Sequence, residues 1–137
     1  MGGASCSSTD LSQTIESCYQ RSRTFLGSSL YWPQNNQFYG ILSNDLTKNI
    51  FANWTKAVFI YCDGVFHQGN SSSSIKYKDG ELFFRGSVIT KAHLKFLDNK
   101  YNLTQTKKMV LTGTSAGGIA TFIWADYIKK ILPNPDT

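Results

Sequence analysis

The chain has 137 residues, of which 41% are hydrophobic, 14% aromatic and 17% charged, as is typical of a single globular domain. No run approaches the roughly 18 consecutive apolar residues that a membrane-spanning helix needs, so we expect no transmembrane helix. The net charge of +5 comes from scattered Lys and Arg and predicts a solvated basic surface. Attraction to a polyanion such as an acidic polysaccharide stays open. Since no nucleic-acid-binding motif is present, we expect no nucleic-acid partner, and we expect a monomer.

The amino terminus shows no signal peptide, because Met1 is followed at once by Gly-Gly-Ala-Ser-Cys without a charged or a long apolar stretch. Alone, this start predicts a cytosolic protein. Three Asn-X-Ser/Thr sequons argue the other way; they begin at Asn53, Asn70 and Asn102. Together with the cysteine spacing, they predict a secreted or cell-wall glycoprotein whose leader is not present in this chain.

The first predicted helix follows the glycine-rich opening and runs from about residue 11 to residue 26. Leu11, Ile15 and Cys18 recur there at helical spacing. Thr9 or Asp10 can cap its start.

Cys6 and Cys18 bracket the first half of this helix, and a disulfide between them would tie the opening loop to the helix surface. The alternative is two free cysteines. Cys62 is then either a buried free thiol or has a partner outside this chain.

Residues 56–61, Lys-Ala-Val-Phe-Ile-Tyr, form a compact β-rich run that predicts a central strand, and Cys62-Asp63-Gly64 ends it with a turn signal. The carboxyl ends of strands face the ligand crevice of an open α/β sheet, so Asp63 is a candidate site-lining residue. An Asx-turn role in holding the loop is about equally well supported.

The later part of the chain alternates between strand and helix signals. Residues 75–84 predict a hairpin around Asp79-Gly80, and residues 87–97, 109–113 and 116–131 predict a helix, a strand and a helix. This order is typical of βαβ units. We therefore predict one partial α/β-hydrolase-like domain over residues 1–137, with a mostly parallel sheet and flanking helices, and we interpret the chain as a fragment.

The strongest motif is Gly113-Thr-Ser115-Ala-Gly117, which lies between the predicted strand and the last helix. A G-x-S-x-G sequence in that context predicts a nucleophile elbow, with Ser115 as the nucleophile. The two glycines would leave room for strand and helix to approach each other. The N–H of Ala116 would stabilise an oxyanion at the helix N-terminus. The alternative is a turn without chemistry.

A serine hydrolase also needs a base and an acid, which in α/β-hydrolases follow the serine in the order Asp or Glu, then His. After Ser115 the chain offers Asp126 and Asp136 but no histidine. His67 could conceivably reach the crevice, whereas His93 is better explained as a helix-surface residue. The simpler interpretation is that acid and base are missing from this chain.

The second half of an oxyanion hole comes from a glycine-rich loop after an early strand. Gly3 and Ala4, in the opening loop, are the candidates for it. The alternative is a disordered amino terminus.

The ordered set of motifs resembles the pectin acetylesterases and the related Notum carboxylesterases over essentially the whole chain. The matching pieces are Gly2-Gly3-Ala4-Ser5-Cys6, Cys18 ahead of Arg21-x-Arg23-x-x-Leu26-Gly27-Ser28-Ser29, Gly40-Ile-Leu-Ser43, Asn53-Trp54, Tyr61-Cys62-Asp63-Gly64, Phe84-Arg85-Gly86 and Gly113-x-Ser115-Ala-Gly-Gly118. The Tyr-Cys-Asp-Gly and Phe-Arg-Gly pieces are nearer to the pectin acetylesterase branch.

The resemblance implies an extracellular α/β-hydrolase that cleaves carboxylic esters without a metal or other cofactor. Plant members of the family deacetylate pectin and Notum deacylates a signalling protein, so the implied partner is an acylated polysaccharide or protein. Ser115 would be the nucleophile, Gly3, Ala4 and Ala116 would supply oxyanion amides, and Cys6–Cys18 would be a family disulfide.

Two departures from the family pattern bear on the site, the first on the lining of the oxyanion hole and the second on the acid and the base. Ser5 or Ala4, depending on the alignment, replaces the Trp that usually follows the glycines. The family's downstream Asp and His are absent. The alternative is therefore a catalytically inactive fragment that binds a glycan or a lipid.

Overall fold

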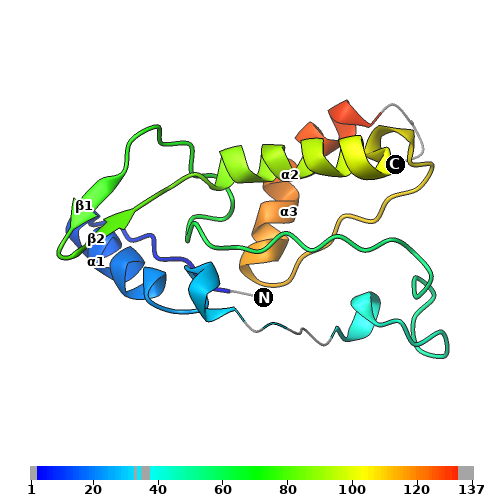
Figure 1. The fold of residues 1–137 in the computed structure, drawn as a ribbon, viewed down its shortest axis with the longest axis horizontal. Coiled ribbons are helices and arrows are strands. Elements are labelled where there is room, and N and C mark those ends of the chain that lie inside the picture. The colour runs from blue at the N-terminus through cyan, green and yellow to red at the C-terminus, as the bar shows by residue number, and fades with distance from the viewer. Residues whose placement is uncertain (1–2, 33, 35–37, 133–137) are drawn as a thin grey trace.

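The computed structural model describes residues 3–32, 34 and 38–132. In chain order the main elements are α1 (Leu11–Ser22), β1 (Ile75–Tyr77), β2 (Gly80–Leu82), α2 (Gly86–Tyr101) and α3 (Ala116–Ile131), with short 3-10 turns at Ser29–Tyr31, Gly40–Leu42 and Leu103–Gln105. Figure 1 shows an elongated arrangement in which α1 and the two strands lie at one end. Helices α2 and α3 form the other part, and long irregular segments connect the two.

Helix α1 begins and ends through side-chain hydrogen bonds. The Asp10 carboxylate accepts the N–H of Gln13 at 2.9 Å and caps the start. The helix ends at Ser22, four residues before the predicted end. The Thr24 hydroxyl donates to the carbonyl of Arg21 at 2.8 Å and so competes with the next helical turn.

Strands β1 and β2 form the predicted hairpin, with Ile75 opposite Leu82 in an antiparallel register. Leu82 is buried in a small apolar cluster with Cys6 and Cys18, which fixes the hairpin against α1. An ion pair of 2.6 Å between Lys78 and Glu16 supports the same contact.

A second apolar cluster joins α2 to α3. Its buried members are Leu94, Ala120, Trp124, Ile128 and Leu132. Phe59 and Met109, from two irregular segments, pack against it. Helix α3 has the predicted bounds, whereas α2 extends four residues past the predicted end and stops at Asn102 in the left-handed conformation, with φ 53°.

The predicted parallel sheet is not confirmed. Among the described residues β1 and β2 are the only strands, and they pair antiparallel; residues 56–61 and 109–113 are not assigned as strands. A strand needs a hydrogen-bonded neighbour about 4.8 Å away, and neither segment has one there. Val58 and Val110, which a central strand would bury, are 38% and 46% exposed.

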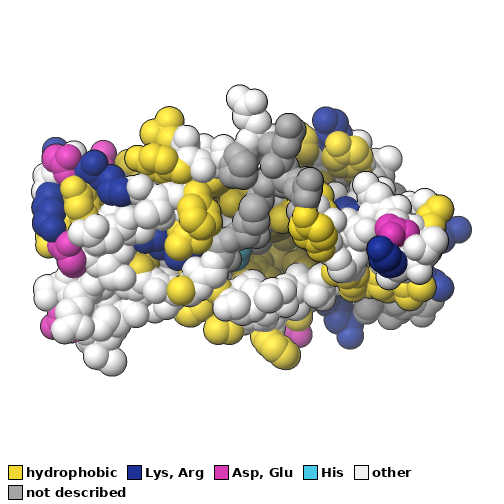
Figure 2. Space-filling view, turned by 90° about the horizontal axis from the view of Figure 1, so that it is seen from below, with side chains coloured by type: hydrophobic (Ala, Val, Ile, Leu, Met, Phe, Trp, Pro, Cys, Tyr) yellow, Lys and Arg dark blue, Asp and Glu magenta, His cyan; other side chains and the backbone are white. Residues whose placement is uncertain are grey.

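Charge and apolar surface are distributed unevenly. In Figure 2 charged side chains gather at both ends of the molecule, and apolar side chains border a hollow near the middle of this face. Within the described ranges, no helix combines the length and apolarity needed to cross a membrane.

Candidate active site around Ser115

Ser115 stands at the junction between residues 109–113 and α3, in a backbone conformation that non-glycine residues rarely adopt. Its φ is 55° and its ψ is −122°, and the residue is exposed. It occupies the N-cap position of α3, yet its hydroxyl makes no capping hydrogen bond. Such strain costs roughly 1–3 kcal/mol and is characteristic of functional turns, including the nucleophile elbow.

Close packing at this turn depends on Gly113. A Cβ on Gly113 would lie 2.1 Å from the carbonyl oxygen of Gly117, a distance that no side chain tolerates. A Cβ on Gly117 would meet nothing within 4 Å. The expectation that both glycines make room is therefore correct only for Gly113.

The amino-terminal loop lies beside the serine. A Cβ built on Gly3 would be 3.8 Å from Ser115 Oγ. Ala4 has a φ of 54°. Within residues 3–32, 34 and 38–132, neither the Ala4 N–H nor the Ala116 N–H donates a hydrogen bond. Ala4 is exposed, whereas Ala116 is buried.

Three contacts hold this loop in place. The predicted disulfide between Cys6 and Cys18 is present. The N–H of Cys6 donates to the carbonyl of Gly64 at 3.0 Å. A guanidinium N–H of Arg21 donates to the carbonyl of Gly3 at 2.9 Å. From Gly3 to Cys6, the loop is therefore ordered beside the site.

A cavity of about 480 Å³ opens in front of Ser115, and its lining includes Gly3, Tyr61, His67 and Thr90. His67 is buried, and its Nδ1 lies 3.3 Å from the Thr90 hydroxyl. Burial lowers the pKa of His67 below its ordinary value, although the nearby Asp63 carboxylate acts in the opposite direction. This histidine is therefore mainly neutral near pH 7.

Asp63 serves the loop that carries His67. Its carboxylate accepts the backbone N–H groups of Val65, His67 and Gly69 at 3.2, 3.1 and 3.0 Å. The residue is buried and is not among those that line the cavity. This geometry corresponds to the turn-holding alternative.

The remaining reactive side chains lie outside this arrangement. Cys62 is a half-buried free thiol whose pKa is raised mainly by burial, so it stays protonated and unreactive. His93 packs edge-on against Phe59, with ring centroids 5.0 Å apart. Asp126 is exposed on α3, and Asp136 lies outside the described residues.

Groups of three or more His, Cys, Asp or Glu that could hold a metal ion do not occur in the described part of the chain.

Comparison with known protein families assigns the whole chain to one of them. All residues, 1–137, match the family model described as Pectinacetylesterase. The chain belongs to the pectinacetylesterase family.

The curated proteins that are similar to the chain include pectin acetylesterases and a Notum carboxylesterase. Pectin acetylesterase 4 of Arabidopsis thaliana is 38% identical over 99% of this chain and 32% of its own length. Pectin acetylesterase 5 of the same plant is 41% identical over 88% of the chain and 28% of its own length. Palmitoleoyl-protein carboxylesterase notum2 of Xenopus laevis is 35% identical over 78% of the chain and 21% of its own length. The chain thus spans about a third or less of these relatives. No solved structure is significantly similar to it.

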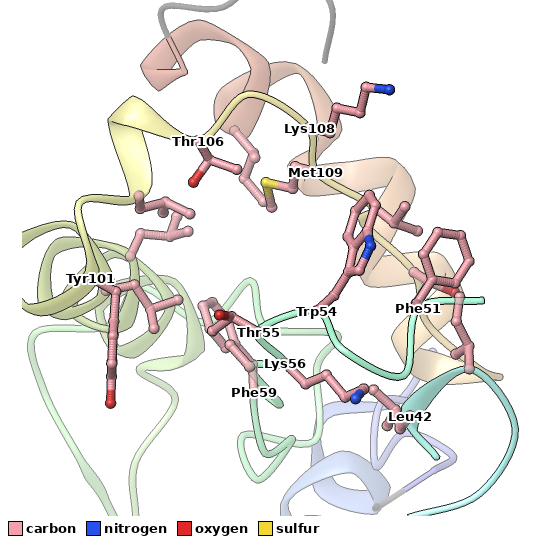
Figure 3. Close-up of a pocket in the computed structure, with 18 residues that line it drawn as sticks. Leu42, Phe51, Trp54, Thr55, Lys56, Phe59, Tyr101, Thr106, Lys108 and Met109 are labelled. Atoms are coloured by element: carbon pink, nitrogen blue, oxygen red, sulfur yellow. The ribbon is translucent and has the colours of Figure 1, made fainter. Parts of the chain in front are cut away.

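A second cavity of this family member, about 470 Å³, adjoins the cavity in front of Ser115 and shares Phe59, Thr112 and Ile128 with it. Figure 3 shows this second cavity. Trp54, Phe59 and Met109 surround it, whereas Lys108 points away. Six of its 18 lining residues come from the two segments that were predicted to be strands.

Sequence reasoning did not assign a role to Arg21, the residue that contacts Gly3. The available signal was its position three residues after Cys18, which places both on the same face of α1. An arginine on a buried helix face is unusual enough to mark a polar contact.

Proposed function

We propose that this chain carries the nucleophile and the oxyanion hole of a serine carboxylic-ester hydrolase. One observation carries the proposal: Ser115 is exposed at the tip of a strained turn, with the Gly3 backbone beside its hydroxyl. The amides of Ala4 and Ala116 have no other partner within the described residues.

In the proposed reaction, Ser115 Oγ attacks the carbonyl carbon of the ester while a base takes its proton. The carbonyl oxygen becomes an oxyanion that accepts the N–H groups of Ala116 and Ala4, with Gly3 as the remaining candidate donor. Collapse of the intermediate breaks the bond to the alcohol, which leaves with the proton from the base. Water then hydrolyses the acyl-serine and restores the hydroxyl.

In a protein as long as the relatives, residues outside this sequence would supply the acid and the base of the triad. No histidine follows Ser115 in this sequence. His67 lines the same cavity, but its Nδ1 faces the Thr90 hydroxyl at 3.3 Å. The alternative function is a catalytically inactive protein that binds a glycan or lipid in this cavity.

We infer an acetylated acidic polysaccharide, such as pectin, as the preferred substrate class. The relatives with 38% and 41% identity are named pectin acetylesterases, whereas the carboxylesterase notum2, whose name specifies a palmitoleoyl-protein substrate, is 35% identical. The net charge of +5 would attract a polyanion. Exposed sequons at Asn53, Asn70 and Asn102 are consistent with a secreted glycoprotein.

We also propose that residues 56–61 and 109–113 become strands of a parallel α/β-hydrolase sheet in a chain of the relatives' length. Support comes from the second cavity, which both segments line with apolar side chains such as Phe59 and Met109. A further strand between them would fill this space and bury Val58 and Val110. A full-length structure in which this cavity lacks a strand would contradict the inference.

The experiment is a Ser115→Ala substitution in the full-length product of the gene, assayed on an aryl acetate and on acetylated pectin. We expect kcat to fall by several orders of magnitude, with a fluorophosphonate probe labelling the wild type and not the variant. Ser73→Ala, at an exposed loop serine outside the Asn70-Ser71-Ser72 sequon, is the control and keeps both activities. If Ser115→Ala turns over the esters at the wild-type rate, Ser115 is not the nucleophile. A wild type that binds pectin but resists the probe supports the inactive alternative.

A further inference from the structure

Arg21 is a buried cation with an unusual set of contacts. Only 9% of its surface is exposed, and its guanidinium carbon lies 4.7 Å from the centre of the Tyr61 ring. Its Nη1 donates to the Gly3 carbonyl, whereas Nε and Nη2 are buried without a hydrogen-bond partner in the described residues.

Such an arrangement is costly for the fold. A buried charge loses hydration, and donors without acceptors lose more. Cation–π attraction between the guanidinium and the face of the Tyr61 ring offsets part of this cost. Among the described residues, the Gly3 carbonyl is therefore the one hydrogen-bond acceptor that the buried guanidinium reaches.

That bond also fixes the direction of the next amide. In a planar trans peptide the C=O of one residue and the N–H of the following residue point in opposite directions. Because the Gly3 carbonyl points to Arg21, the Ala4 N–H points away from Arg21. Ser115 Oγ is close to this peptide, 3.8 Å from the position that a Cβ on Gly3 would occupy.

We propose that Arg21 is a positioning residue that keeps the Gly3–Ala4 peptide in the orientation required for an oxyanion hole. The inference rests on the proposed esterase function. Ala4 is held at a φ of 54°, which an alanine avoids when it is free to relax. Without Arg21 the peptide can rotate, and a carbonyl oxygen in place of the N–H would repel the oxyanion.

The test uses the full-length protein with Arg21→Met, which keeps an unbranched chain against Tyr61 but removes the donor. Replacing a buried charge with an apolar side chain is often tolerated by the fold. We expect kcat per active site, titrated with a fluorophosphonate, to fall by about 10²- to 10³-fold, the range for one lost oxyanion donor. KM for the aryl acetate should change by less than about threefold. A merely structural role would lower the number of active sites and leave kcat per site unchanged.

Arg23→Met is the matched control on the same helix, because Arg23 pairs with Asp79 at the surface and does not reach Gly3. It should keep kcat within about twofold. A folded Arg21→Met protein with wild-type kcat per site overturns the proposal.

If Arg21→Met does not fold, Arg21→Lys decides. Its ammonium ends short of the Nη1 position, so we expect at least a tenfold loss of kcat, and wild-type kcat overturns the proposal. Activity that survives Ser115→Ala would instead refute the esterase mechanism itself, so the two failures are distinguishable.

Discussion

The carboxylate of Asp63 lies so close to the backbone of Gly86 that a Cβ at residue 86 would stand 1.9 Å from Oδ2. Two motifs that are 20 or more residues apart in the sequence, Tyr61–Gly64 and Phe84–Gly86, therefore form one packed unit at the start of α2. The loop that Asp63 holds carries His67 into the cavity. Stability of this unit and shape of the site are thus linked.

Gly86→Ala should lower the free energy of unfolding by about 2–3 kcal/mol, because the added methyl must displace the Asp63 carboxylate. Urea unfolding of the full-length protein measures the loss. In a double-mutant cycle with Asp63→Ser, the two losses should be clearly less than additive, since the smaller side chain relieves the overlap. Additive losses would show that the two residues do not compete for this space.

The features that the sequence predicted correctly are those whose determining residues lie close together in the chain. The Ser115 elbow, the 75–84 hairpin and the bounds of α3 were predictable, because glycine spacing, strand alternation and proline stops act within a few residues. Asp63 remained ambiguous, since a turn carboxylate and a site carboxylate have the same sequence signature.

Other features depend on contacts that a pattern does not encode. The parallel sheet was predicted from β-rich runs, but a strand forms only beside a partner, and residues 56–61 have none in the described chain. Helix α1 ends early because the Thr24 hydroxyl binds a carbonyl. Arg21 was overlooked as a site residue because a charge at that position predicts solvent exposure, whereas the structure buries it.

The two elbow glycines should respond differently to the same substitution. Gly113→Ala should cost about 2–3 kcal/mol or more of unfolding free energy, because its Cβ overlaps the carbonyl of Gly117. Gly117→Ala has open space on the first turn of α3 and should be neutral or stabilising by up to about 1 kcal/mol. Thermal melts of both variants test this, and an equal loss in the two would contradict the geometry described for the turn.

Loss of the Cys6–Cys18 disulfide should affect both stability and activity. The bridge closes a loop with a sequence separation of 12 residues, so a Cys6→Ser/Cys18→Ser protein should lose about 3 kcal/mol of unfolding free energy. Because the bridge also holds the amino-terminal loop, we expect kcat on an aryl acetate to fall at temperatures well below the melt. Cys62→Ser, at the free thiol, is the control and should cost less than about 1 kcal/mol. Full kcat in the double variant would show that the loop keeps its position without the bridge.

His67 should make the protein less stable as the pH falls. Burial holds its pKa in the folded state below the ordinary 6.5, so between these two values the unfolded chain binds more protons than the folded chain. Unfolding free energy must therefore decrease as the pH drops through this window, and the contribution is complete above pH 6.5. Asn tolerates the φ of 61° at this position, so His67→Asn is a suitable variant. Urea unfolding from pH 7 to pH 5 should give a flatter profile for His67→Asn than for the wild type, and parallel profiles would contradict a buried neutral imidazole.

The amides of Ala4 and Ala116 come from opposite ends of the described chain, and this separation has a consequence for biosynthesis. On the ribosome, Ala4 emerges long before the serine turn exists, so the pair can form only after nearly all of this sequence has been made. Ester cleavage would need this pair in addition to the acid and the base, so a nascent chain that stalls or is clipped before Ala116 would remain chemically silent.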